Sequence, residues 1–159
     1  MSCATPVALS WVGKQGRFCL AEDCYQLGPL GPAWRVVQRH EGEIGFFNAE
    51  LGGVIQSNAA CRQDVEAAPL QSLLDHLLVG YTDRRVRSAE TVPLVERDAL
   101  RTVLDVKLDG VPMVLDLYVF KRNGCLFDLS FAAAPEGYAR GAVDFQRFVG
   151  GFASRPARS

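Results

Sequence analysis

The stretch from Leu100 to Phe131 constrains the fold most, because residues suited to a buried face alternate with polar ones around two short turn sequences. Every second residue from Leu100 to Leu108 fits such a face, which predicts a β-strand that lies against a core. Asp109-Gly110 then supplies a two-residue turn of the type that matches the twist of paired strands. Pairing Leu108 with Val111 gives a self-consistent register, so the sequence predicts an antiparallel meander.

The second turn of the meander, at Asn123-Gly124, admits two registers. A two-residue loop places Asp128 opposite Val119, which puts a carboxylate on the face expected to be buried. A three-residue loop that begins at Arg122 instead aligns Val119 with Phe127 and keeps one apolar face across all three strands. We therefore predict the three-residue loop.

Two amphipathic helices are predicted, one before the meander and one after it. In residues 69–79 five leucines fall on one helical face, and Gly80 follows as a stop. Residues 135–149 begin at a proline, carry Glu136 in the first turn and end before two glycines. Shorter strands are expected at 34–37, 44–48 and 54–58. This order of elements predicts an α+β domain in which helices cover an antiparallel sheet.

The length and charge of the chain limit its organisation and its partners. A chain of 159 residues suits one domain, assigned here to residues 17–152, with 1–16 as an extended leader and 153–159 as a disordered tail. Seventeen Lys and Arg residues against 18 Asp and Glu give a net charge of -1, which disfavours nucleic acid as a partner. No apolar run approaches the roughly 20 residues that cross a bilayer. Membrane attachment is therefore expected only through a lipid anchor.

The closing part of the sequence resembles the closing half of PsbP-like proteins. The resemblance rests on the run from Leu108 to Phe131, on Ala-Pro-Glu-Gly-Tyr at 134–138, and on Asp144 to Val149 followed by Gly151-Phe152. In these proteins a meander leads into a final helix that begins after a Pro-Glu turn. The resemblance implies a PsbP-like α/β/α sandwich. It also implies an accessory protein without chemistry of its own, because PsbP-like proteins are known mainly as extrinsic subunits.

The five cysteines are many for a domain of this size, and their spacing fits no zinc site. The opening Met-Ser-Cys-Ala-Thr-Pro resembles the mature start of bacterial lipoproteins, which makes Cys3 a candidate for lipidation. That expectation requires an apolar signal segment upstream of Met1. The alternative is that Cys3 is an ordinary thiol on a frayed terminus.

The remaining four cysteines can pair completely in an oxidising compartment. We favour a bond between Cys19 and Cys24 across a tight hairpin and a second between Cys61 and Cys125. The second bond closes a long loop, which contributes about 4 kcal/mol in the chain-entropy model. The alternative leaves Cys61 and Cys125 as small buried hydrophobic residues at strand ends.

Motifs for catalysis and for cofactor binding are absent from the sequence. It contains no Gly-x-Ser-x-Gly, no phosphate-binding glycine loop ahead of a helix and no His-Glu-x-x-His. His40 and His76 are interpreted as surface residues, although His76 could reach a partner near Asp83 or Arg84. The Arg84-Arg85-Val86-Arg87 cluster is interpreted as a solvated loop or as a contact for an anionic partner. We therefore expect no enzyme activity, no cofactor and no metal.

A candidate binding surface follows from the predicted register. Tyr118 lies opposite Arg101 on one neighbouring strand and opposite Asp128 on the other, with Asp116 next along its own strand. An arginine, a phenol and carboxylates then share one row, which is a candidate groove for a ligand or a protein partner. The structural alternative is a cross-strand ion pair that rests on an aromatic ring.

The function expected from these residues is that of a non-catalytic accessory or binding protein of the bacterial cell envelope. We expect it to be periplasmic and anchored through Cys3, with a protein partner or small ligand that the sequence does not identify. One alternative is a small-ligand-binding or small hydrolytic protein on the same scaffold. The other is a cytoplasmic protein-interaction module with reduced thiols.

Overall fold

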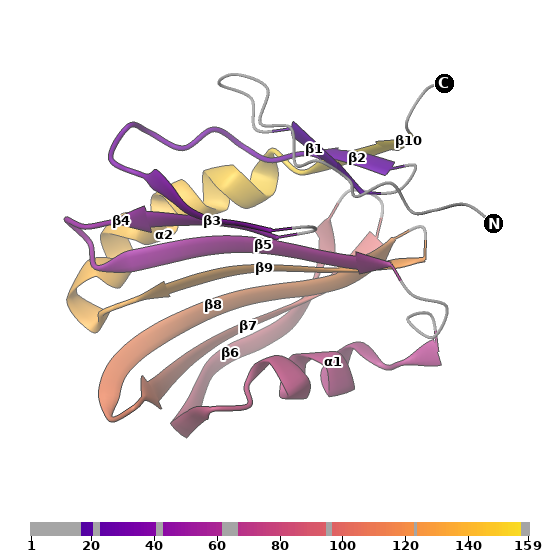
Figure 1. Cartoon of the computed structure of the whole chain (residues 1–159). Helices are drawn as coiled ribbons and strands as arrows, with labels where there is room; N and C mark the ends of the chain where they lie inside the picture. Colours follow the sequence, from indigo (N-terminus) through magenta and orange to yellow (C-terminus); the bar gives the residue numbers. More distant parts are fainter. Residues whose placement is uncertain are drawn as a thin grey trace.

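The large sheet is antiparallel throughout. The computed structural model of the chain describes residues 17–20, 23–40, 43–61, 67–94, 97–122 and 124–156. The sheet contains β3 (Arg35–His40), β4 (Glu43–Asn48), β5 (Gly53–Cys61), β6 (Tyr81–Leu94), β7 (Arg97–Leu108), β8 (Val111–Arg122) and β9 (Cys125–Ala133). Their order across it is β3-β4-β5-β9-β8-β7-β6. Helices α1 (Leu70–Leu77) and α2 (Pro135–Gly150) lie on opposite sides of this sheet, as Figure 1 shows. The α+β class and the PsbP-like layering are confirmed.

The predicted pairing of β7 with β8 is confirmed. Leu108 pairs with Val111, and the register continues from there without a shift. Asp109 and Gly110 both have positive φ, at 51° and 80°. Two positive φ angles define the hairpin turn whose twist matches that of the flanking strands, and Asp and Gly adopt them most easily.

The predicted pairing of β8 with β9 is wrong. Arg122 pairs with Cys125 and Val119 with Asp128, so the connection is the two-residue loop that the prediction rejected. The prediction assumed that only one face of the meander is buried. In the structure a helix covers each face, so both faces of β8 and β9 are largely apolar and alternation does not select the register.

Two separate clusters of buried side chains hold the helices on the sheet. Under α2 the cluster includes Phe120, Phe127, Phe131, Phe145 and Phe148. Under α1 a smaller cluster joins Leu74 and Leu78 to residues from β7 and β8, namely Leu104, Val106, Leu115, Leu117 and Val119. The α2 side is therefore the larger core, and the α1 side is more thinly covered.

Local sequence explains where the helices begin and end. Pro69 has extended backbone angles and immediately precedes α1, and Gly80 (φ 97°) lies in the turn that leads to β6. Pro135 occupies the first turn of α2 together with Glu136, and Arg147 lies in its last turn. These charges suit the two ends of the helix dipole. Neither described helix is long and apolar enough to cross a membrane.

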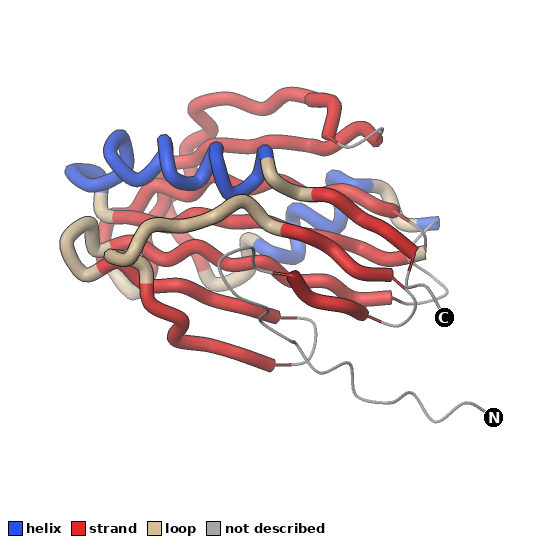
Figure 2. The backbone as a smooth tube through the Cα atoms, turned by 90° about the horizontal axis from the view of Figure 1, so that it is seen from above, coloured by secondary structure: helices blue, strands red, loops and turns tan. Residues whose placement is uncertain are grey.

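The loop after β2 packs closely along α2, as Figure 2 shows for the tan segment beside the helix. The amide of Gly28 donates to the carbonyl of Phe148 at 2.9 Å. A Cβ at Gly28 would come within 1.9 Å of the Arg147 carbonyl oxygen, so only glycine permits this approach. The indole Nε1 of Trp34 donates to the Asp144 carboxylate at 2.9 Å and fixes the other end of the loop.

A small sheet contains β1 (Arg17–Leu20), β2 (Asp23–Gln26) and β10 (Ala153–Pro156). The tail predicted to be disordered from residue 153 is corrected here, because its first four residues pair with β2. Backbone pairing with an available strand places this segment in the small sheet. The leader 1–16, including Cys3, lies outside the described residues.

The predicted bond between Cys61 and Cys125 is confirmed. The two residues pair directly, at the end of β5 and the start of β9. Cys19 pairs with Cys24 across the β1–β2 hairpin. Their side chains lie outside the described part of the chain, so this second disulfide stays a prediction.

Candidate functional site

Three of the four residues predicted as a binding row come together on the α2 face of the sheet. Arg101 donates to Asp116 through two parallel bonds, from Nε to Oδ1 at 3.1 Å and from Nη2 to Oδ2 at 2.9 Å. The Asp116 side chain is fully buried, and Tyr138 on α2 donates its hydroxyl to Oδ2 at 3.0 Å. The carboxylate therefore accepts three hydrogen bonds in a site closed to solvent.

Helix α2 covers Tyr118. The phenol is 4% exposed and donates to Oε1 of Gln146 on α2 at 3.0 Å, while the Arg101 guanidinium lies 5.2 Å from the ring centroid. Burial raises the pKa of the Tyr118 phenol. Burial, together with the Asp116 charge, raises the pKa of Tyr138 to about 12. These contacts fit the structural alternative, an ion pair on aromatic rings that fastens α2 to the sheet.

Asp128 does not belong to this row. The two-residue turn places Leu129 opposite Tyr118, and Asp128 opposite Val119 on the other face of the sheet. Asp128 is 8% exposed and lines a cleft between α1 and the sheet. The structure thus divides the four predicted residues between a closed network under α2 and a cavity beside α1.

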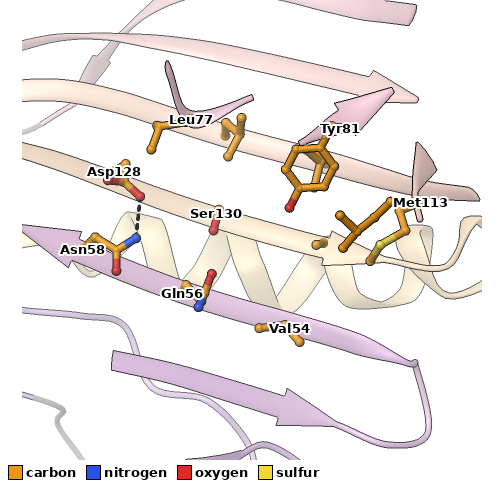
Figure 3. Close-up of a pocket in the computed structure, with 12 residues that line it drawn as sticks. Val54, Gln56, Asn58, Leu77, Tyr81, Met113, Asp128 and Ser130 are labelled. Carbon is orange, nitrogen blue, oxygen red and sulfur yellow. Dashed lines mark hydrogen bonds between the residues drawn. The ribbon is translucent and has the colours of Figure 1, made fainter. Parts of the chain in front are cut away.

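The cavity beside α1, called here the α1 cleft, has a volume of about 270 Å³. Its lining comes from β5, β8 and β9, from the end of α1, and from the adjoining ends of β6 and β7: Val54, Gln56, Asn58, Leu77, Tyr81, Leu108, Met113, Leu115, Leu117, Asp128, Ser130 and Ala132. Figure 3 shows the labelled side chains projecting into one space, from neighbouring strands and, for Leu77, from helix α1. Because α1 is short and its core cluster is small, the helix leaves part of this sheet face uncovered.

One end of the α1 cleft is polar. Asn58 pairs with Asp128 across β5 and β9, and its side-chain amide donates to Oδ1 at 2.8 Å. One step along the same face, Gln56 pairs with Ser130. The next pair is Val54 with Ala132, where the lining becomes apolar. The cleft therefore grades from polar to apolar over four residues of β9, about 13 Å at the usual rise of a strand.

The Asp128 carboxyl group is unusually basic. Its pKa is raised to about 6, mainly by burial and to a smaller extent by the charge of Glu43 on β4. The Asn58 amide acts in the opposite direction, because it donates to the charged form. A buried carboxyl group with a raised pKa inside a cavity marks a candidate functional site.

The other end of the α1 cleft opens onto apolar surface. Leu108 lines the cleft, is 38% exposed, and pairs with Tyr81 on one side and Val111 on the other. Val111 is itself 58% exposed, and Val79 in the turn after α1 is 72% exposed. An apolar mouth of this kind adjoins a cavity that a ligand can enter.

The remaining charged candidates do not join the cleft. His76 is exposed in the last turn of α1. The arginine cluster lies in strand β6, which corrects its interpretation as a loop. Arg84 donates to the carbonyl oxygens of Leu78 and Tyr81 and so caps the end of α1, and Arg87 forms a bidentate pair with Asp105. The side chain of His40 lies outside the described part of the chain. Among the described residues, no three His, Cys, Asp or Glu side chains gather as metal ligands do.

Sequence reasoning missed the polar partners of Asp128 in the cleft. Gln56 and Asn58 lie two residues apart in β5, on either side of Ser57, and Asp128 and Ser130 have the same spacing in the otherwise apolar β9. Polar side chains two residues apart in each of two strands were the available signal. Such residues point to the same face, and they meet when the strands pair.

No family model and no curated protein matches this chain. Solved structures match it along most of its length. The cyanobacterial PsbP of Synechocystis has a TM-score of 0.58 at 9% identity, with 91% of this chain and 94% of that one covered. The chain has a PsbP-like fold.

Two further neighbours extend the comparison. LpqN of Mycobacterium tuberculosis, described as involved in cell envelope biogenesis, has a TM-score of 0.61 at 11% identity, with 84% of each chain covered. A protein from Bacteroides thetaiotaomicron has a TM-score of 0.57 at 17% identity, with 85% of this chain covered. This chain spans only 46% of that longer protein. The structural similarity shows the PsbP-like fold. At identities this low it says nothing of function, which has to be argued from the site.

Proposed function

We propose that this PsbP-like chain is a non-catalytic binding protein of the bacterial cell envelope that holds an apolar ligand in the α1 cleft. Its place is the periplasm, with acylated Cys3 as its membrane anchor. The ligand in turn links it to a partner in the envelope, and nucleic acid is not among its partners. The observation that carries the proposal is the cleft itself, a cavity with an apolar mouth and a buried carboxyl group at its far end.

The lining of the α1 cleft supports binding rather than chemistry. Among the described residues that line it, Asp128 and Tyr81 are the ionisable ones, and burial raises the pKa of the Tyr81 phenol. No described lining residue is a histidine, cysteine or lysine. Ser130 lies on the same face as Asp128, but a serine nucleophile needs a base that also orients it, and the described lining offers none beyond the carboxyl group. The few polar groups of this lining can orient a bound ligand.

The disulfide supports a location in the periplasm. Bonds such as that between Cys61 and Cys125 persist in oxidising compartments and are rare in the cytosol. The LpqN neighbour, which is described by its part in envelope biogenesis, agrees with this location. Acylation of Cys3 is testable by the intact mass of the chain isolated from membranes of its host. An unmodified Cys3 in that material contradicts the lipid anchor and leaves the cleft proposal in place.

The test of the cleft uses a neutral, apolar fluorescent probe, N-phenyl-1-naphthylamine. We expect the wild-type protein to bind it with enhanced fluorescence. The variant Ala132→Phe places a ring in the middle of the cleft and should reduce the affinity at least tenfold. Ala139→Phe is the matched control, because Ala139 is exposed on α2, on the opposite face of the sheet. Melting temperatures of both variants show that they fold.

Two results contradict the proposed function. One is a wild-type protein that does not bind the probe at concentrations where it remains soluble. The other is equal binding by wild type and a folded Ala132→Phe variant, which would place the probe elsewhere.

A further inference from the structure

We infer that the α1 cleft selects a single-chain amphiphile whose head group is a protonated amine, held by Asp128, with the chain lying toward Tyr81 and Leu108. This inference rests on the proposed function and adds the chemical class of the ligand. It follows from the distribution of polar and apolar side chains along the cleft, together with the charge at its polar end.

The polar end of the cleft suits a small cation that donates hydrogen bonds. Asp128 accepts a hydrogen bond at Oδ1 from Asn58, and an ionised carboxylate has acceptor sites for further donors. Glu43 pairs with Asn58 on the side away from Asp128, and this second carboxyl group makes the local potential more negative. An ammonium group satisfies a buried carboxylate with charge-assisted hydrogen bonds, whereas a carboxylate or phosphate head group meets repulsion there.

The rest of the cleft suits a hydrocarbon chain. Beyond Ser130 the lining consists mainly of Val54, Ala132, Leu115, Met113, Leu108 and Tyr81. The volume of about 270 Å³ equals that of about nine waters at roughly 30 Å³ each, which matches a slender chain better than a fused ring system. Burial of each methylene contributes about 0.8 kcal/mol, and the exposed Val79 and Val111 extend the apolar surface for a chain that emerges from the mouth.

The protonation state of Asp128 links this selectivity to pH. Its pKa of about 6 means that protons compete with the ammonium group below that pH. The groups that act on it are Asn58 on β5 and Glu43 on β4, and Leu77 on α1 lines the same cleft. The Tyr81 phenol at the start of β6 lines the other, apolar end. Lys121 lies two residues beyond Val119 on the same face of β8 and does not line the cleft. Binding of the amine should therefore strengthen between pH 5 and pH 8.

The experiment measures displacement of N-phenyl-1-naphthylamine by four ten-carbon probes: decylamine, decanol, decanoate and decyltrimethylammonium. At pH 8 we expect decylamine to bind at least tenfold more tightly than decanol, and decanoate to bind more weakly than decanol. Decyltrimethylammonium carries the charge without an N–H donor and should lose most of the advantage. Asp128→Asn should abolish the preference for the amine and leave decanol binding unchanged. Asp98→Asn, an exposed carboxylate on β7, is the matched control.

Each outcome decides between the two proposals. If decanol and the naphthylamine probe bind but decylamine shows no preference, the amine inference fails and the proposed function stands. The same holds if Asp128→Asn keeps the preference, or if decyltrimethylammonium equals decylamine. If no probe binds in the cleft, the proposed function itself fails. Should Asp128→Asn not fold, the pH dependence in the wild type decides, because a flat ratio of amine to alcohol affinity between pH 5 and pH 8 contradicts a role for Asp128.

Discussion

The two bidentate arginine–aspartate pairs of this sheet make a matched test of what burial does to an ion pair. Arg101 with Asp116 and Arg87 with Asp105 have nearly equal bond lengths, between 2.8 and 3.1 Å. Each guanidinium also lies within 6 Å of a tyrosine ring centroid. They differ in the carboxylate, because the Asp116 side chain is 0% exposed and the Asp105 side chain is 39% exposed.

The expected effects of removing each arginine differ severalfold. Arg101→Ala removes two of the three hydrogen bonds to the buried Asp116 carboxylate and leaves that from the Tyr138 hydroxyl, and loss of one partner of a buried pair costs about 3–5 kcal/mol. Because Arg101 is itself 24% exposed, water can reach part of the vacated site, so we expect about 3 kcal/mol. Arg87→Ala breaks an exposed pair and should cost less than about 1 kcal/mol.

Urea unfolding without reductant, followed by circular dichroism, measures both losses as shifts in the midpoint at unchanged m-value. The larger loss corresponds to a fall in melting temperature of about 6–12 °C for a chain of this length. A double variant, Arg101→Met with Asp116→Leu, should recover much of the loss, because it removes the charge along with its partner. Equal losses from Arg101→Ala and Arg87→Ala would refute the assignment of the cost to burial.

Two further predictions concern opposite faces of the sheet. The pKa of Asp128 is about 6 in the folded protein and ordinarily near 4, so this group favours folding below about pH 4 and loses that contribution as the pH rises through 6. The free energy of unfolding of Asp128→Asn, relative to that of the wild type, should therefore increase by about 2–3 kcal/mol between pH 4 and pH 8. A difference in unfolding free energy that does not change with pH would contradict the raised pKa. On α2, Gly141→Ala would bring a Cβ within 2.3 Å of the buried Phe131 ring and should cost about 1–3 kcal/mol. Gly150→Ala meets nothing within 4 Å and should be neutral or stabilising by up to about 1 kcal/mol, as the same unfolding assay will show.

Local signals were sufficient to predict the helices and the first hairpin. The leucine spacing before Gly80 and the Pro-Glu start of α2 are short-range patterns, and both helices form where they occur. Asp109-Gly110 demands positive φ at both residues, so the turn itself fixes the pairing of β7 with β8. In each case the information lies within a few residues of the element it determines.

The register of the second hairpin was predicted wrongly because a continuous apolar face was given more weight than the preference of the turn sequence. Asn123-Gly124 favours a two-residue loop, but that loop placed Asp128 on a face that was assumed to be core. The actual face carries the α1 cleft, where a carboxyl group is tolerated beside an amide and a cavity. A polar residue in an apolar strand therefore signalled a site, and the prediction treated it as an error of register.

The disulfide held information about the cleft that the prediction did not use. Cys61 opposite Cys125 fixes the antiparallel register of β5 with β9, and three residues inward along each strand that register places Asn58 opposite Asp128. The polar end of the cleft thus follows from a cysteine pairing that the sequence did predict, once the two strands are taken to be antiparallel. The cysteine pairing does not determine which face of the sheet these polar side chains occupy. Whether Asp128 points toward α1 or α2 depends on the turn at 123–124 and on how far a short helix reaches across the sheet, and both are set by packing between distant parts of the chain.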